Sequence, residues 1–363
     1  MLAECIGMRD RGHEVWLATP GAGMLSRRAV EAGLDVVPFT FDRLRLPFRA
    51  HRLASLVRRV AADVVNSHSS ADSWTAALAR RTGWGGAALV RSRHISAMVR
   101  PGPLHRLLYG SADYLITTGE SVRQGLAASG LVPSDRSMSI PTGVDVTLYA
   151  PRPEYRAAAR RSLDLDETAP VVGVVAYLRA DKGHTVLLQA MTAVLESQPA
   201  AVLVVVGDGP RRADLEAQAA RLDVASHVRF AGLREDVPFV LSALDIFCLP
   251  SVRNEGVPQS ILQASAASLP VVSTRVGGIP EAVASEVTGQ LVPPGDPGSL
   301  ARAILGLLAD PERRRSFGEA GRRRVSDAVS VKAMLDRTEA AYAAALGSVT
   351  RSVAVPKRSR RAP

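Results

Sequence analysis

The chain contains the stretch Ala201-Val-Leu-Val-Val-Val-Gly-Asp-Gly-Pro210, and the fold follows from it. An unbroken apolar run of this length predicts a strand that is buried on both faces, as in a parallel sheet. Gly207 and Gly209 let the backbone turn sharply and come close to a ligand, and Pro210 suits the first turn of a helix. The stretch therefore predicts a strand, a glycine turn and a helix, which is the order of a βαβ unit.

The same alternation of short apolar runs and amphipathic stretches extends toward both ends of the chain. It predicts an α/β fold with two Rossmann-like, doubly wound parallel-sheet domains that face a cleft. Helices are expected, for example, over Arg211–Leu222 and Gln259–Ala267. In the first half the predicted strands are Glu14–Ala18, Asp35–Pro38, Val64–Ser67, Ala88–Arg91, Tyr114–Thr117 and Ser137–Ile140. In the second half they are Val171–Ala176, Ala201–Val206, Val228–Ala231, Ile246–Leu249, Val271–Ser273 and Gly289–Val292.

The two prolines of Ala150-Pro-Arg-Pro153 predict a linker between the domains. We expect one domain over residues 1–150, a second over 151–325, a C-terminal helix over 326–347 that packs back on the first domain, and a disordered basic tail over 348–363. Residues 1–12 have the pattern of a helix end, although a doubly wound domain usually opens with a strand. The N-terminal domain is therefore expected to lack its first strand.

The composition limits the class of protein. The chain has 363 residues, of which 47% are hydrophobic, so it can form two cores built from Ala, Val and Leu. The formal net charge of +10 indicates either an anionic partner or solvated, arginine-rich helix faces. Cys5 and Cys248 have no metal-binding spacing, so neither a metal site nor a disulfide framework is expected. No apolar run reaches the ~18 residues of a membrane span and no secretory pattern opens the chain, which predicts a cytoplasmic protein.

Charged residues follow several of the predicted strands. Arg179 and Lys182 come after the strand Val171–Ala176, where two cations either grip a diphosphate or remain solvated loop residues. Glu255 lies in a turn containing Gly and Pro, where its carboxylate can face the cleft, and the helix after it offers an N-terminus for an anion. Glu281 follows Gly277 and Gly278 and is expected to complement a helix dipole.

Two histidines follow predicted strands of the first half. His94 comes after Ala88–Arg91, and His68 comes after Val64–Ser67. A single histidine is most often structural, but both of these lie at carboxyl ends of strands, where ligands of parallel sheets bind. His94 is the stronger candidate for a functional role.

Taken together, these signals resemble the retaining glycosyltransferases of family 4, which have the GT-B fold. The resemblance extends from Arg11-Gly-His-Glu-Val15 to about residue 345 and includes residues 140–151 and 236–251. It implies that Lys182 grips the diphosphate of a nucleotide-sugar donor with Arg179 as its partner, that Glu255 contacts the donor sugar, and that His94 lies near the reacting sugar. It also implies same-face attack without a metal or cofactor, and a UDP- or GDP-sugar as co-substrate.

The resemblance assigns further positions of the second domain to the donor site. Gln263 stands where relatives carry an acid that binds the ribose, and the turn that begins at Gly232 is expected near the nucleobase. A neutral amide in place of a carboxylate costs about 1–2 kcal/mol, or roughly tenfold in donor affinity. Many relatives carry Arg at the position of Tyr177. The positions expected to bind the donor are Gly207, Gly209, Gly232, Leu233, Gly256, Val257, Pro258, Gln259 and Gln263.

The resemblance thus predicts a transferase that moves a sugar to a lipid-linked or polysaccharide-precursor acceptor of the cell envelope. The basic first half predicts loose association with the anionic inner face of the membrane. Two alternatives stay open: a nucleotide-sugar 2-epimerase, and a catalytically weakened paralogue that binds nucleotide sugar. Nucleic acid is not expected as a partner, because basic patches interleaved with aromatic residues are absent.

Overall fold

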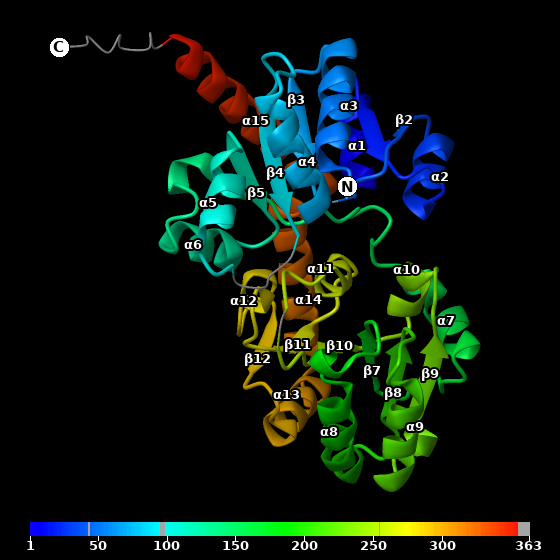
Figure 1. Ribbon diagram of the computed structural model, residues 1–363. Helices are drawn as coiled ribbons and strands as arrows, with labels where there is room; N and C mark the ends of the chain where they lie inside the picture. The colour runs from blue at the N-terminus through cyan, green and yellow to red at the C-terminus, as the bar shows by residue number, and fades with distance from the viewer. Residues whose placement is uncertain (43, 95–98, 254, 355–363) are drawn as a thin grey trace, which may run out of the picture. The chain divides into compact units, whose positions relative to one another are not determined.

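The computed structural model describes residues 1–42, 44–94, 99–253 and 255–354. Its backbone contacts divide the chain into two units (Figure 1). The first unit comprises Met1–Pro141 and the segment that begins at Val331, and the second comprises Thr142–Ser330. Every predicted strand is found, with bounds that differ by at most two residues at either end. The α/β fold with two Rossmann-like units is therefore confirmed, whereas the cleft between them stays a prediction.

The second unit contains a six-stranded parallel sheet in the order β12-β11-β10-β7-β8-β9. The chain runs outward from β7 through β8 and β9, and then restarts on the other side of β7 with β10. The carboxyl ends of β7 and β10 therefore form a topological switch point, where ligands of such sheets bind. The strands are β7 (Val171–Val175), β8 (Val202–Val206), β9 (Val228–Gly232), β10 (Ile246–Leu249), β11 (Val271–Thr274) and β12 (Gly289–Val292).

Helices cover both faces of this sheet, so its strands are apolar throughout. All the residues of β8 and β10 are buried, which explains their unbroken runs of Val, Leu, Ile, Phe and Cys. Cys248 is among these buried residues. The helices are α7 (Arg156–Ser162), α8 (His184–Ser197), α9 (Arg212–Arg221), α10 (Val237–Leu241), α11 (Gln259–Ala266), α12 (Ile279–Ala282), α13 (Pro297–Ala309) and α14 (Pro311–Ala328).

The first unit contains two parallel sheets, β1-β2 and β3-β4-β5-β6. In a doubly wound sheet of order 3-2-1-4-5-6, the strand that comes first in the chain lies between the second and the fourth. Here β1 and β3 correspond to that second and fourth strand, so the position of the first strand is the one between them. No described strand occupies it, as the sequence predicts. The strands are β1 (Trp16–Thr19), β2 (Asp35–Pro38), β3 (Val64–Ser67), β4 (Ala88–Arg93), β5 (Tyr114–Thr117) and β6 (Ser137–Ser139). The helices are α1 (Leu2–Asp10), α2 (Met24–Glu31), α3 (Leu46–Arg59), α4 (Ser70–Arg81), α5 (Pro103–Gly110), α6 (Glu120–Ala128) and α15 (Val331–Ala354).

Alternate residues of β4 belong to the two faces of the larger sheet of the first unit. Leu89 is buried in a cluster with residues of α3 and α4. Ala88 and Val90 are buried in a cluster with residues of α15. Since side chains along a strand alternate between the faces, Arg91 and Arg93 share the α4 face with Leu89.

The end of the chain differs from the prediction. The expected helix over residues 326–347 is two helices, because α14 continues to Ala328 and α15 begins at Val331. The expected disordered tail begins too early, because α15 continues to Ala354. The helix can continue through position 347 because one glycine costs only about 1 kcal/mol there, and no proline follows before Ala354. Residues 355–363 of the predicted tail lie outside the described residues.

The boundary between the units also differs from the expected linker at residues 150–153. The second unit already begins at Thr142. The Val144 N–H donates to the Val329 carbonyl over 2.8 Å, so this segment pairs with the last residues of its own unit. The sequence pattern does not reveal a contact between residues so far apart along the chain.

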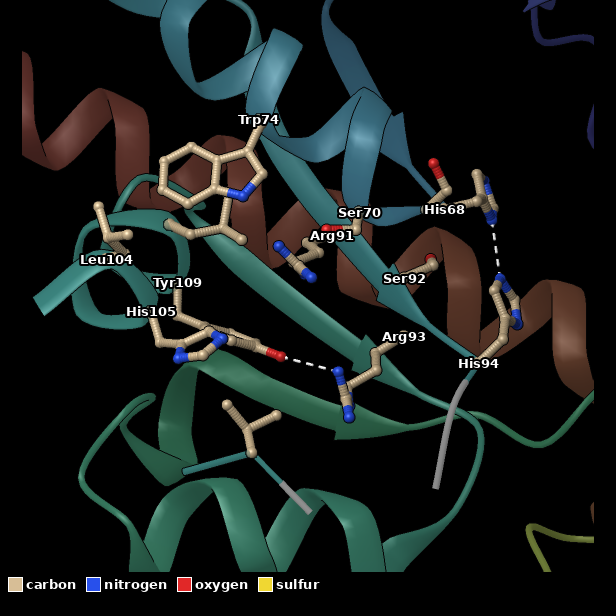
Figure 2. Close-up of a pocket in the computed structure, with 13 residues that line it drawn as sticks. His68, Ser70, Trp74, Arg91, Ser92, Arg93, His94, Leu104, His105 and Tyr109 are labelled. Carbon is tan, nitrogen blue, oxygen red and sulfur yellow. Dashed lines mark hydrogen bonds between the residues drawn. The ribbon is translucent and has the colours of Figure 1, made fainter. Parts of the chain in front are cut away.

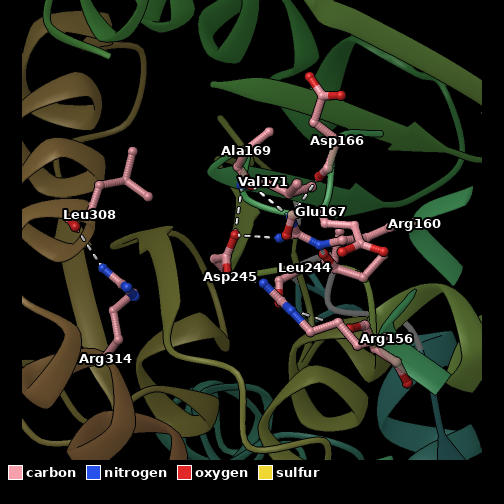
Figure 3. Close-up of polar contacts among 12 residues, drawn as sticks. Arg156, Arg160, Asp166, Glu167, Ala169, Val171, Leu244, Asp245, Leu308 and Arg314 are labelled. Carbon is pink, nitrogen blue, oxygen red and sulfur yellow. Dashed lines mark hydrogen bonds and ion pairs between the residues drawn. The ribbon is translucent and has the colours of Figure 1, made fainter. Parts of the chain in front are cut away.

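The carboxylate of Asp245, at the amino end of β10, binds residues of α7 and of the amino end of β7 in the second unit (Figure 3). Its carboxylate accepts from Arg156 at 2.6 Å, from Arg160 at 2.9 Å and from the Val171 N–H at 2.8 Å. Arg160 is 1% exposed, and its other hydrogens go to backbone carbonyls, including that of Ala169. The carboxylate therefore holds α7, the start of β7 and the start of β10 together.

We expect Asp245→Asn to destabilise the second unit by about 3 kcal/mol, because it leaves the buried Arg160 charge without its counterion. Urea unfolding followed by circular dichroism measures this. The matched control is Glu216→Ala, which removes an exposed i,i+4 pair with Arg212 and is expected to cost less than about 0.5 kcal/mol. Equal effects of the two substitutions would contradict the structural role of Asp245.

Candidate functional site

Lys182 and Glu255 form an ion pair at the switch point of the second unit. Lys182 ends a short 3-10 turn after β7, and Glu255 lies in the loop after β10. The Lys182 Nζ is 2.8 Å from both Glu255 Oε1 and Oε2, and the Ser251 hydroxyl donates to Oε2 over 2.6 Å. Glu255 is 6% exposed. The structure thus brings together two site residues that the sequence predicted separately, 73 positions apart.

The loops that carry this pair are packed so closely that two glycines are required. Gly183 has a φ of +75°, and a Cβ there would lie 1.8 Å from the Pro250 carbonyl oxygen. Gly277 has a φ of +53°, and a Cβ there would lie 2.0 Å from the Glu255 carbonyl oxygen. Side chains other than hydrogen rarely fit such backbone. Glycine at both positions therefore lets the loops after β7, β10 and β11 pack directly against one another.

The helix α11 follows the Glu255 loop and presents an uncapped N-terminus. Its N-cap is Pro258, which has no side chain to accept a hydrogen bond, and its first turn contains no acid. Gln259 uses its side-chain amide to donate to the Thr142 carbonyl over 2.7 Å. Gln263, one turn further along, is partly buried. Unpaired N–H groups and the helix dipole make this end of α11 attractive to an anion.

The glycine turn after β8 lies against the Lys182 loop. The Leu178 N–H donates to the Asp208 carbonyl over 3.0 Å, between the expected donor residues Gly207 and Gly209. Gly207 in turn donates its N–H to the Gly232 carbonyl over 2.8 Å. Leu233, which follows Gly232, is 80% exposed. Gly256 and Val257 continue the Glu255 loop toward Pro258, so the structure gathers the predicted donor positions into adjoining loops of this unit.

Arg179 occupies a different place from Lys182. Its guanidinium pairs with Asp181 at 3.2 Å and lies 5.8 Å from the ring centre of Tyr177. The side chain of Arg179 is 53% exposed, against 16% for Lys182. The structure therefore groups Lys182 with Glu255 and places Arg179 beside them in the same loop as a solvated cation. Its expected part in gripping a diphosphate stays a prediction.

His68 and His94 are paired within the first unit (Figure 2). The His68 Nδ1 is 3.0 Å from the His94 Nε2, and the rings are stacked with centroids 5.3 Å apart. Desolvation and the neighbouring His94 lower the pKa of His68 to about 3, and desolvation also lowers the pKa of His94. Both rings are therefore neutral at pH 7, and one donates its hydrogen to the other.

The residues beside this pair were not predicted from the sequence. A cavity of about 320 Å³ opens at the carboxyl ends of β3 and β4, and Arg91, Arg93 and Tyr109 line it together with both histidines (Figure 2). The available signal was two arginines at alternate positions, Arg91 and Arg93, directly after the apolar run Ala88–Val90. Arg91 was interpreted only as the last residue of the predicted strand Ala88–Arg91, and Arg93 was left outside it.

Neither a metal cluster nor a membrane span is found in the described part of the chain. No three His, Cys, Asp or Glu side chains there come together as metal ligands. No helix formed by these residues is both long enough and apolar enough to cross a membrane.

Solved structures share this architecture. A glycosyltransferase from Rickettsia africae superposes with a TM-score of 0.86 at 19% identity, over 95% of this chain and 93% of that one. The Anabaena protein HepE, solved in complex with UDP, superposes with a TM-score of 0.83 at 20% identity, over 94% of each chain. Two Rossmann-like units, with the observed strand orders, define this chain as a protein of the GT-B fold.

Comparisons of sequence are more specific. The family model described as Glycosyltransferase Family 4 matches residues 2–148, and that described as Glycosyl transferases group 1 matches residues 156–324. A GDP-mannose-dependent phosphatidylinositol monomannoside mannosyltransferase of Mycolicibacterium smegmatis is 31% identical over 87% of this chain and 87% of its own length. A D-inositol 3-phosphate glycosyltransferase of Segniliparus rotundus is 34% identical over 72% of this chain and 62% of its own length. The chain belongs to glycosyltransferase family 4.

We expect stability to fall as the pH drops from about 6.5 toward 4, because His184, next to the Lys182 loop, is buried. Burial and the Lys182 charge lower the pKa of His184 from 6.5 to about 4. Below pH 6.5 the unfolded chain binds a proton that the folded chain excludes, so stability is complete above this range and decreases within it, by about 3 kcal/mol at its lower end. His68 acts in the same direction.

Urea unfolding at pH 7.5, 6, 5 and 4.5 measures this dependence. The His184→Gln variant removes the group that titrates, so its stability should change less with pH than that of the wild type, whatever its value at pH 7.5. Parallel pH profiles for the two proteins would show that His184 is not the cause.

Proposed function

We propose that this glycosyltransferase takes its sugar from a UDP- or GDP-sugar bound to the second unit. The observation that carries the proposal is the Lys182–Glu255 pair at the switch point, beside the uncapped N-terminus of α11. A nucleotide sugar needs a cation and backbone N–H groups for its diphosphate, and a carboxylate for its sugar hydroxyls. The M. smegmatis relative is GDP-mannose-dependent, and HepE was solved with UDP, which supports both nucleotide classes.

The geometry of the pair suits a role with an anionic ligand. A lysine ammonium has three hydrogens, and Lys182 directs two of them to the oxygens of Glu255, which leaves one for a phosphate oxygen. Glu255 keeps lone pairs for sugar hydroxyls, although Ser251 and Lys182 already donate to it. Lys182 and the amides of α11 then stabilise the charge that builds on the leaving diphosphate.

We propose that transfer retains the configuration of the sugar and needs no metal. The bond between the anomeric carbon and the diphosphate breaks, the acceptor oxygen bonds to the same face of that carbon, and the leaving phosphate takes the acceptor proton. Lys182 and the α11 N-terminus supply the positive potential that a metal ion would otherwise give. His94 is the residue of the first unit that we propose to act near the reacting sugar.

We propose a lipid-linked or polysaccharide-precursor acceptor and a place at the inner face of the cell membrane. The relatives named above act on phosphatidylinositol mannoside and on D-inositol 3-phosphate. Phe48, on helix α3, is 57% exposed, and Leu44, the residue before the N-cap of this helix, is 97% exposed. Arginines flank both, including Arg45 and Arg49. Apolar side chains among arginines favour an anionic lipid surface.

We expect Glu255→Gln to lower kcat/KM for sugar transfer at least 100-fold, because the variant loses the charge that holds Lys182 and the sugar hydroxyls; the loss corresponds to about 3 kcal/mol. Release of UDP or GDP from a panel of nucleotide hexoses, with D-inositol 3-phosphate as acceptor, measures the rate. The matched control is Arg253→Ala, an exposed residue of the same loop, which should keep the wild-type rate. Wild-type turnover by the folded Glu255→Gln variant would refute the assignment.

Gln263→Glu is expected to tighten binding of the donor nucleotide about tenfold, because a carboxylate accepts stronger hydrogen bonds from ribose hydroxyls than an amide does. Calorimetric titration with UDP and GDP measures the dissociation constants. Gln263→Ala serves as control and should bind no more tightly than the wild type. If the glutamate variant gains nothing over the alanine variant, Gln263 does not contact the ribose.

A further inference from the structure

The cavity of the first unit is lined by residues of that unit alone, whereas the donor site proposed above consists of residues of the second unit. It opens at the carboxyl ends of β3 and β4, where α4 begins, and α5 closes its other side. Its volume of about 320 Å³ is at the lower end of small-molecule sites. Figure 2 shows the guanidinium of Arg91 between Trp74 and Tyr109, with Arg93 beside Tyr109.

Arg91 is the unusual member of this lining. It is 7% exposed, and its Nη1 has no hydrogen-bond partner among the described residues. The guanidinium carbon lies 4.6 Å from the ring centre of Tyr109, which stabilises the charge without accepting its hydrogens. A buried N–H group without a hydrogen-bond acceptor costs free energy, and an anionic ligand in the cavity would supply the acceptor that Nη1 lacks.

The carboxylate of Asp72 is not a hydrogen-bond partner of Arg91. Asp72 acts on it through space, but its oxygens accept from the backbone N–H groups of His68 and Ser69. Ser69 in turn accepts from the Asp72 N–H, which closes the N-terminus of α4 with a capping box. The positive potential of the cavity therefore comes from the two arginines and not from the helix end.

Arg93 adds a second cation on the same face of β4. Its Nη1 donates to the Tyr109 hydroxyl over 3.0 Å. The histidine pair contributes hydrogen-bonding nitrogens without charge at pH 7, because the pKa of each ring is lowered. Apolar side chains, among them Trp74 and Leu104, complete the wall. Two guanidinium groups with neutral donors and an apolar wall fit a phosphate ester that carries a compact hydroxylated carbon skeleton.

We propose that this cavity binds the phosphate ester of the acceptor, with the Arg91 guanidinium as its principal contact. The inference rests on the proposed function, because it identifies the acceptor as a phosphorylated polyol whose hydroxyl receives the sugar. The same chemistry is present in a free polyol phosphate and in the headgroup of an inositol lipid. Arg91 is thus a residue that determines specificity for acceptors with a phosphate.

Calorimetric titration of the full chain, without donor, tests the proposal directly. D-inositol 3-phosphate should bind saturably, and both myo-inositol and inorganic phosphate should bind at least tenfold more weakly. Arg91→Gln should weaken binding of D-inositol 3-phosphate at least tenfold, while Arg81→Gln, an exposed arginine at the other end of α4, should leave it unchanged. Thermal unfolding checks that the Arg91→Gln variant is folded, and Arg91→Lys, which keeps the charge, should recover part of the affinity.

Equal affinity of the wild type and a folded Arg91→Gln variant would overturn the assignment, as would binding of inorganic phosphate as tight as that of the ester. Co-sedimentation with vesicles of phosphatidylcholine containing phosphatidylinositol separates the two sources. Loss of this binding in Arg91→Gln identifies the lipid headgroup, and binding of the free ester alone identifies a soluble acceptor. If the ester binds through Arg91 but no nucleotide sugar is consumed, the proposed function fails and the cavity assignment stands. If transfer occurs and Arg91→Gln leaves the acceptor KM unchanged, the proposed function stands and the cavity assignment fails.

Discussion

The Lys182–Glu255 ion pair is the interaction on which the rest of the second unit's site depends. Removing two charges from water is costly, and their attraction compensates only when the geometry is fixed and the remaining lone pairs are used. Here Ser251 donates to the carboxylate, and the glycines at positions 183 and 277 let the loops that carry the pair pack closely together. A lysine positioned in this way presents its ammonium group before an anion arrives, so the donor site that we propose would be ordered in advance.

The two units use the same physical principle with different side chains. In each, the carboxyl ends of parallel strands present polar groups that a buried sheet could not otherwise carry. The second unit places a cation, a carboxylate and an uncapped helix end there. The first places two neutral histidines and two arginines there, and its helix α4 is already capped. This difference favours a diphosphate with its sugar in the second unit and a single phosphate ester in the first.

Sequence reasoning predicted most of the fold, because parallel strands buried on both faces appear as short apolar runs that are easy to locate. Lys182 and Glu255 could be selected because each follows such a run. Their pairing could not, since it depends on the strand order that places β10 beside β7. Arg91 was missed because a charged residue at the end of a strand is usually solvated, and only the packing of α4 and α5 shows that it is buried. The extent of α15 was missed because the helix was expected to end at Gly347, although a single glycine does not end it.

The most direct test of the central claim is calorimetric titration of the full chain with GDP and UDP, in the wild type and in a Lys182→Met variant. Methionine keeps the apolar length of the side chain and removes the charge that Glu255 holds in place. The account predicts that one of the two nucleotides binds the wild type at a single site, and that the folded variant binds it at least tenfold more weakly. Equal affinity for the two proteins, or no binding of either nucleotide to the wild type, would contradict it.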